Sequence, residues 1–198
     1  MLPSNGMLNS TAPHPAPFDL AASARSEMVR EGFHIGDTPG AAEQLAAIHN
    51  ALASPPAGIR DLTSLLWSSI DNDTSRDLDQ IEFAETVDGG IRVLIGIADV
   101  AAAVAKDSPL DNAAAGQTQT VYTAVENFPM LPFELSTDLT SLNPGQTRQA
   151  IVCEFVVGEN GVPTGAAIYP ALVRNQAQLA YSTVGPWLEG STPSGWAS

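Results

Sequence analysis

Hydrophobic and polar residues alternate with a period of two over most of the chain after residue 61, which is the pattern of half-buried β-strands. Two turn signals lie within this region: Asp88-Gly89-Gly90 and Glu159-Asn160-Gly161 each separate a pair of alternating segments, which predicts two hairpins. The strand-like segments are LLWSSI (65–70), QIEFAETV (80–87), IRVLIGIADV (91–100), QTVYTAV (119–125), QAIVCEFVV (149–157) and TGAAIYPALVRN (164–175).

The first third of the chain has a helical period instead. DLAASARSEMVREGF predicts a helix capped by Asp19 and stopped by Gly32, and AAEQLAAIHNALAS predicts a second one ended by Pro55 and Pro56. We expect shorter helical pieces at 110–115 and 134–142, and a helical tendency at 179–190 that Pro186 complicates. The sequence therefore predicts an α+β fold: a mixed, mostly antiparallel sheet with flanking helices and a small helical N-terminal lead-in.

These patterns divide the chain at about residue 56. Residues 1–56 are expected to be a flexible tail (1–18) and the helical lead-in, whereas 57–198 form the larger domain, with a loop at STPSGWAS. The 44% hydrophobic and 15% charged residues are typical of a folded chain. The lone Cys153 excludes an internal disulfide and a cysteine-rich zinc site, and we see neither a secretory signal nor a membrane-spanning run. A cytoplasmic location is the default.

Charge narrows the set of partners. The formal net charge is −14, and Lys106 is the only lysine, so the surface repels nucleic acid at long range. Any binding of nucleic acid would depend on bound cations, a few local arginines or regions outside this sequence.

The most acidic stretch, Ser68 to Glu85, allows three interpretations. A calcium loop would begin at Asp71 and end at Glu82, but it needs glycine where Arg76 stands and helices where the flanks are strand-like. A polar turn would suit several of the aspartates. In an extended backbone, however, Asp77 and Asp79 share one face, and converging carboxylates favour a hard cation such as Mg²⁺ or Mn²⁺.

Several segments in order also resemble the ribonuclease II/R (RNB) family. They are IDNDTSRDLDQ, DGGIRVLIGIADV, VYTAVENFPMLPFELSTDLTSLNPG and RQAIVCEFVV, and the likeness runs from about Asp61 to Gly190. It implies a partial RNB catalytic domain and a processive 3′→5′ exoribonuclease that uses Mg²⁺ to hydrolyse single-stranded RNA to nucleoside 5′-monophosphates. We expect no membrane association and no DNA specificity, and the sequence does not identify protein partners.

The resemblance also implies roles for individual residues. Asp71, Asp77 and Asp79 occupy three of the family's four metal-binding aspartate positions, and Gln80 stands at the fourth, where it removes one negative charge. Tyr122 and Tyr181 correspond to tyrosines that line the RNA site, and aromatic rings of this kind stack on bases without sequence preference. Arg76 is a further candidate for substrate binding. We expect Asp99 to be structural, and Arg148 and Arg174 to be ordinary surface or strand-end residues.

Two further hypotheses remain open beside the nuclease. The later half of the family's domain has no counterpart here, so we expect little turnover from these 198 residues alone. Together with Gln80 and the acidic surface, this motivates a non-catalytic RNA-binding or interaction module as the alternative. A calcium-binding structural domain is the third hypothesis, and it predicts stabilisation by Ca²⁺ over Mg²⁺.

Overall fold

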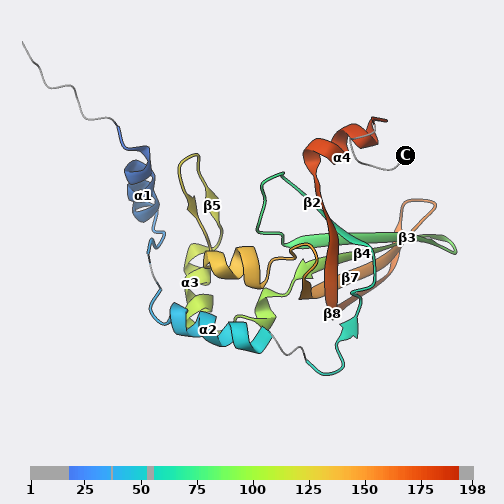
Figure 1. Cartoon of the computed structure of the whole chain (residues 1–198), viewed down its shortest axis with the longest axis horizontal. Helices are drawn as coiled ribbons and strands as arrows, with labels where there is room; N and C mark the ends of the chain where they lie inside the picture. Colours follow the sequence, from blue (N-terminus) through green and yellow to red (C-terminus); the bar gives the residue numbers. More distant parts are fainter. Residues whose placement is uncertain (1–17, 37, 53–55, 192–198) are drawn as a thin grey trace, which may run out of the picture.

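The computed structural model describes residues 18–36, 38–52 and 56–191 of the chain. The expected flexible tail lies outside these residues except for Phe18, and so does all of the expected C-terminal loop after Ser191. The described part has helices gathered beside a strongly curved β-sheet (Figure 1). The predicted α+β class, with a mixed and mostly antiparallel sheet, is confirmed.

The sheet closes into a barrel. Its main strands are β2 (Trp67–Asp71), β3 (Gln80–Val87), β4 (Gly90–Ala98), β7 (Thr147–Gly158) and β8 (Pro163–Ala180). They pair in the order β8-β2-β3-β4-β7, and β7 also pairs with β8, which closes the ring. The β2–β8 pairing and the contact of the short β1 (Arg60–Asp61) with β8 are parallel, whereas the other pairings of the barrel are antiparallel.

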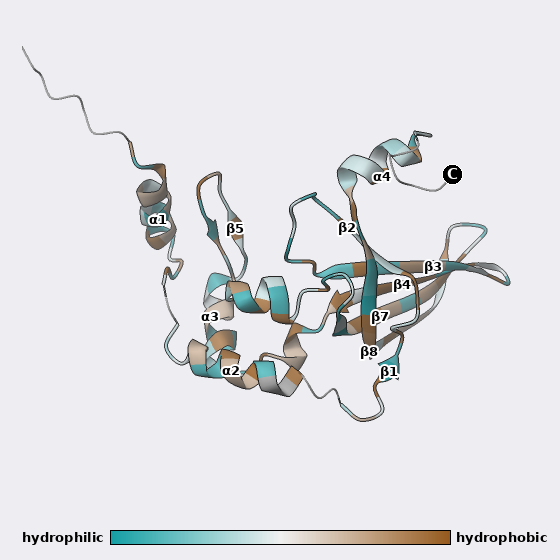
Figure 2. Cartoon of the chain, viewed as in Figure 1, coloured by the Kyte–Doolittle hydropathy of each residue, from teal (hydrophilic) through white to brown (hydrophobic). Residues whose placement is uncertain are grey.

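Alternation along the strands fills the barrel interior, and Figure 2 shows polar and apolar residues interspersed along these strands. The buried core comprises Trp67, Leu78, Ile81, Leu94, Leu142, Ala150, Val152, Ala171 and Val173. Gly96 packs among these residues, where a larger side chain would be crowded: a Cβ at this position would lie 3.1 Å from Cγ1 of Ile81. The indole Nε1 of Trp67 donates to the carbonyl of Leu62 at 2.9 Å, so this large buried ring has its one polar atom satisfied.

The helices form a second core beside the barrel. α2 (Ala41–Leu52) packs with α3 (Pro109–Gln117) and with the π-helical segment η2 (Leu135–Leu139) around Ile48, Leu110 and Leu135. α1 (Leu20–Arg30) lies farther out, where the carboxylate of Glu126 accepts from Arg25. The remaining elements are the 3₁₀ turn η1 (Val100–Ala102), the short pair β5 (Val121–Tyr122) and β6 (Asn127–Phe128), and α4 (Tyr181–Leu188).

Both helices of the lead-in and both hairpins agree with the sequence prediction. Asp19 caps α1 by accepting from the amide of Ala22 at 3.0 Å, and Gly89 in the β3–β4 turn has a φ of 86°, which glycine adopts without strain. Among the strands, two predictions differ most from the structure. The strand expected at 119–125 is only Val121–Tyr122, and β8 continues five residues past Asn175 because β2 pairs with that extension.

Candidate functional site

The acidic segment connects β2 to β3 at one end of the barrel, and it is the polar loop next to β2 in Figure 2. Asp71 is the last residue of β2, and Asp79 directly precedes β3. Residues Asn72 to Asp79 form no sheet pairing of their own. Strands on both sides of this loop, as predicted, are not the helices that flank a calcium-binding EF-hand loop.

Three carboxylates define what we call the acidic cluster: Asp71, Asp77 and Asp79. Asp71 and Asp79 line one small pocket together with Gln80 and Tyr181. Asp71 and Asp77 are half-buried, whereas Asp79 is exposed. Residues from β2, the loop and the start of α4 therefore meet at one end of the barrel.

Asp77 faces the two-stranded β5–β6 sheet. Its Oδ2 accepts a hydrogen bond from the hydroxyl of Tyr122, whose ring is 63% exposed. This hydrogen bond, partial burial and the negative charges of Asp77, Asp79 and Asp71 raise the pKa of Tyr122 to about 12. All three members of the acidic cluster thus act electrostatically on one phenol, which fits their convergence on one region.

Within residues 18–36, 38–52 and 56–191, no member of the acidic cluster forms an ion pair with a basic side chain. Arg76 lies in the same loop, but its side chain is exposed and forms no ion pair either. Neighbouring Glu82 adds to the local charge: one of its oxygens is buried without a hydrogen-bond partner in the described structure. Burial, opposed in part by a backbone hydrogen bond, and then the charge of Asp79 raise the pKa of Glu82.

The donor set suits a hard, oxygen-preferring cation, yet the carboxylates do not form a closed cage. Across the described ranges, no three His, Cys, Asp or Glu side chains lie in an arrangement that could hold a metal ion. Mg²⁺ needs no such cage, because it commonly keeps several waters and uses one or two carboxylates together with substrate phosphates. Asp71 and Asp79, at one pocket with the Gln80 amide, fit a cation held in this way. The metal assignments of Asp71, Asp77, Asp79 and Gln80 stay predictions.

The two tyrosines lie on separate sides of the acidic cluster. Tyr181 begins α4, is 57% exposed and lines the pocket with Asp71 and Asp79. Tyr122, in β5, approaches from the side of Asp77. Two largely exposed rings beside a carboxylate pocket provide stacking surfaces for bases.

Several residues that the sequence did not single out hold this region together. Oγ of Ser182 donates to both carboxylate oxygens of Asp73, at 2.8 and 3.0 Å, which ties the acidic loop to α4. Ser141 and Asn175 are buried polar residues bonded to the segments that carry the acidic cluster. Asn175 could have been noticed, because it takes an inward position in the alternation of β8, between Val173 and Ala177. Nothing in the sequence around Ser141 marks it.

Two expectations about other charged residues have different outcomes. Asp99 is structural, as predicted: its Oδ1 accepts from the amide of Ala102 at 3.1 Å and caps η1. Arg148, expected to be an ordinary surface or strand-end residue, does lie at the start of β7, but it is not simply exposed. Its guanidinium is partly buried and donates to the carbonyls of Ser141 and Asp138 at 3.2 and 3.0 Å, and burial lowers its pKa.

Comparisons with known proteins agree with this architecture. The family model described as "RNB domain" matches residues 59–195. Exoribonuclease 2 of Salmonella heidelberg is 35% identical over 158 residues, which is 73% of this chain and 24% of that protein. The chain therefore spans about a quarter of the length of the curated relatives that it matches.

Solved structures give the same result. RNase R of Mycoplasma genitalium in complex with double-stranded RNA has a TM-score of 0.79 and 29% identity, covering 89% of this chain and 32% of that one. Yeast Ssd1, described as a pseudonuclease, has a TM-score of 0.61 at 14% identity, covering 70% of this chain and 18% of its own. At that identity the likeness to Ssd1 concerns the fold alone.

Proposed function

The chain belongs to the RNB domain family, whose members that it resembles include exoribonucleases, and on this premise we propose that it is the RNA-cleaving part of a metal-dependent 3′→5′ exoribonuclease. The observation that carries the proposal is the convergence of the acidic cluster. Asp71 and Asp79 line one pocket with Tyr181, and Asp77 is hydrogen-bonded to Tyr122 beside them. Single-stranded RNA is the proposed substrate, and nucleoside 5′-monophosphates are the proposed products.

In this proposal each residue has a role that follows from the chemistry of its side chain. Asp71 and Asp79 hold Mg²⁺ or Mn²⁺ together with waters and a phosphate of the substrate, and Gln80 contacts the metal or its water through the amide carbonyl. A divalent cation placed there supplies a more acidic water and neutralises charge that develops on the phosphate. Tyr122 and Tyr181 stack on bases near the RNA end, and the exposed guanidinium of Arg76 is free to approach a phosphate.

The net charge of −14 makes the cation more important. Without it, a phosphate would approach three carboxylates that no basic side chain of the described structure neutralises. None of the described helices is long and apolar enough to cross a membrane. A cytoplasmic location, expected from the lone cysteine, stays part of the proposal.

The decisive experiment uses the full-length natural protein that carries this sequence. We expect it to release nucleoside 5′-monophosphates from the 3′ end of single-stranded RNA with Mg²⁺ but not with EDTA. Asp79→Asn should reduce the rate by at least about 100-fold, because removing a metal ligand costs more than removing a residue that only supports one. Asp88→Asn, in the β3–β4 turn, is the matched control and should keep the wild-type rate. Equal rates for both variants would refute the assignment.

A non-catalytic RNA-binding module is the second candidate. Gln80 favours it, because this neutral side chain weakens the attraction of the site for a metal. The shared fold with a protein described as a pseudonuclease shows that the scaffold occurs in such proteins. Tight RNA binding by the full-length wild-type protein, without any Mg²⁺- or Mn²⁺-dependent release of mononucleotides, would favour this candidate.

A further inference from the structure

The loop that carries Asp77 depends on contacts from elsewhere in the chain, because residues 72–79 have no strand partner. Ser182 bonds to Asp73 in the first half of the loop, and three hydrogen bonds from the segment after η2 hold the part around Asp77. Oγ of Ser141 accepts from the amide of Leu78 at 3.0 Å and donates to the carbonyl of Arg76 at 2.8 Å. The amide of Leu142 donates to the carbonyl of Leu78 at 2.8 Å. One hydroxyl therefore fixes the backbone on both sides of Asp77.

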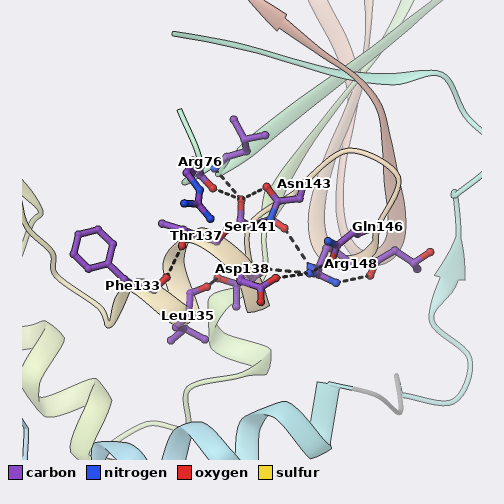
Figure 3. Close-up of polar contacts among 12 residues, drawn as sticks. Arg76, Phe133, Leu135, Thr137, Asp138, Ser141, Asn143, Gln146 and Arg148 are labelled. Carbon is purple, nitrogen blue, oxygen red and sulfur yellow. Dashed lines mark hydrogen bonds and ion pairs between the residues drawn. The ribbon is translucent and has the colours of Figure 1, made fainter. Parts of the chain in front are cut away.

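Ser141 is itself held firmly. It is 2% exposed, and its carbonyl accepts from Nε of Arg148 at 3.2 Å. The same guanidinium donates to the carbonyl of Asp138 at 3.0 Å, which joins η2 to the start of β7 (Figure 3). Nδ2 of Asn143 adds a bond to the carbonyl of Thr137 at 3.1 Å. Ser141, which is hydrogen-bonded to the acidic loop, thus belongs to a turn that is itself held by several hydrogen bonds.

The same turn also reaches the segment that carries Asp71. Nδ2 of Asn175, a buried residue of β8, donates to the carbonyl of Leu142 at 2.9 Å and to Oγ of Ser69 at 3.0 Å. Ser69 lies two residues before Asp71 on β2, so the two side chains have the same orientation relative to the sheet. Residues 141 and 142 are therefore connected to both segments of the acidic cluster.

We propose that Ser141 is a positioning residue of the site, whose hydroxyl sets the direction of the Asp77 carboxylate relative to Asp71 and Asp79. This inference rests on the proposed function, because it assigns Ser141 a task in metal binding and cleavage. Removing the hydroxyl leaves the buried amide of Leu78 without its partner and frees the carbonyl of Arg76. The loop then relaxes around Asp77, and small displacements of a functional group reduce binding and rate strongly.

Thr140 provides a matched control on the neighbouring residue. Its hydroxyl is also buried, but it donates to the carbonyl of Leu135 at 2.9 Å inside the end of η2 and does not contact the acidic loop. Thr140→Val and Ser141→Ala each remove one buried hydroxyl in adjacent positions, but only the second removes hydrogen bonds to the acidic loop. A merely structural role for Ser141 would make the two variants alike.

The test compares Ser141→Ala, Ser141→Cys and Thr140→Val in the full-length natural protein. Binding of Mn²⁺, measured by calorimetry without RNA, and kcat and KM for single-stranded RNA are the readouts. Replacing a residue that holds a metal ligand in place typically reduces metal affinity or activity by a factor of about 10 to 100. We expect Ser141→Ala to lose that factor in Mn²⁺ affinity and kcat with little change in KM. The cysteine variant, a weaker hydrogen-bonding group of similar size, should be intermediate, and Thr140→Val should stay near wild type.

Failure of the Ser141 role and failure of the proposed function would give different results. Wild-type protein that cleaves RNA, with folded Ser141→Ala and Thr140→Val variants that bind Mn²⁺ and turn over alike, would overturn the role of Ser141 alone. Wild-type protein that neither binds Mn²⁺ nor cleaves RNA would overturn the proposed function and the positioning role with it.

Discussion

Two polar clusters on the same barrel handle negative charge in opposite ways. The balanced cluster comprises Arg60, Glu85, Arg92, Glu154 and Tyr169. Nε of Arg92 lies 2.8 Å from Oε1 of Glu154, and its Nη1 lies 2.7 Å from Oε1 of Glu85. The guanidinium of Arg60 stacks on the ring of Tyr169, 3.8 Å from its centre. Here each carboxylate has a cation supplied by the chain.

The acidic cluster has no such cation in the described part of the chain. The consequence is visible in the pKa values. The pKa of the tyrosine is raised in both clusters, but Arg60 opposes the rise that burial and Glu154 cause at Tyr169, and Arg92 lowers the pKa of Glu154. At Tyr122 no cation opposes the effect of Asp77 and burial, and the pKa is raised to about 12. In the balanced cluster, the negative charges of Glu85 and Glu154 are neutralised by Arg92 of the same chain. The acidic cluster keeps charge that no basic side chain of the described residues neutralises, which is the physical basis of the proposed metal site.

The largest expected effect comes from breaking the balanced cluster. Arg92→Met leaves Glu154 and Glu85 without their shared cation on a partly buried surface, so we expect the free energy of unfolding to fall by about 2 kcal/mol. Urea denaturation of the 198-residue chain measures this. Arg30→Met, which removes the exposed ion pairs of Arg30 with Glu27 and Glu31, is the control and should cost no more than about 0.5 kcal/mol. Equal losses would show that the balanced cluster contributes no more than a surface pair.

The next effect should appear only when a cation is added. At a Mg²⁺ concentration of ten times Kd, binding to the folded state alone stabilises it by about 1.4 kcal/mol. We expect the melting temperature of the wild-type chain to rise with Mg²⁺, and that of the Asp71→Asn/Asp79→Asn double variant to stay constant. Asp73→Asn, whose carboxylate is bonded to Ser182, should respond like wild type. A larger stabilisation by Ca²⁺ than by Mg²⁺ would favour the calcium-binding hypothesis instead.

The sequence was a good guide to the fold where local signals act alone. The cap at Asp19 and the glycine turn at Gly89 depend only on neighbouring residues, and both elements formed as predicted. The sequence was a poor guide where a distant strand decides. β8 continues to Ala180 because β2, about a hundred residues earlier, pairs in parallel with its second half.

The same distinction holds for the site. Asp71, Asp77 and Asp79 are close in sequence, so their spacing already predicted that they lie near one another. The contacts made by Ser141 and Asn175 span 63 and 106 residues. Alternation along β8 marks Asn175 as an inward polar residue but does not indicate its partner, and nothing around Ser141 marks that residue. The seemingly ordinary Arg148 owes its partial burial to η2 and the turn after it. Supporting residues are therefore harder to predict than the groups they support.

The smallest expected effect is a loss of stability at high pH, which comes from ionisation of the Tyr122 hydroxyl beside the acidic cluster. Near neutral pH this hydroxyl stays protonated, so stability does not vary with pH through this group. The folded chain holds the Tyr122 proton with a pKa of about 12, whereas an unfolded chain releases it near the ordinary value of about 10. The hydrogen bond to Asp77 therefore stabilises the fold fully below pH of about 10, and this contribution is lost as the pH rises toward about 12.

The ultraviolet absorbance of ionised tyrosine measures this pKa directly, with Tyr122→Phe subtracted to remove the signals of Tyr169 and Tyr181. Asp77→Asn keeps the shape of the side chain and removes its charge, so we expect the midpoint of Tyr122 to move most of the way back toward about 10. Asp73→Asn should leave the midpoint unchanged, because Asp73 is not among the groups that raise it. If both substitutions shift the midpoint equally, the pKa of Tyr122 depends on the overall negative charge of the protein. The acidic cluster would then lose its distinction from the rest of the surface, and the contrast with the balanced cluster would rest on the ion pairs alone.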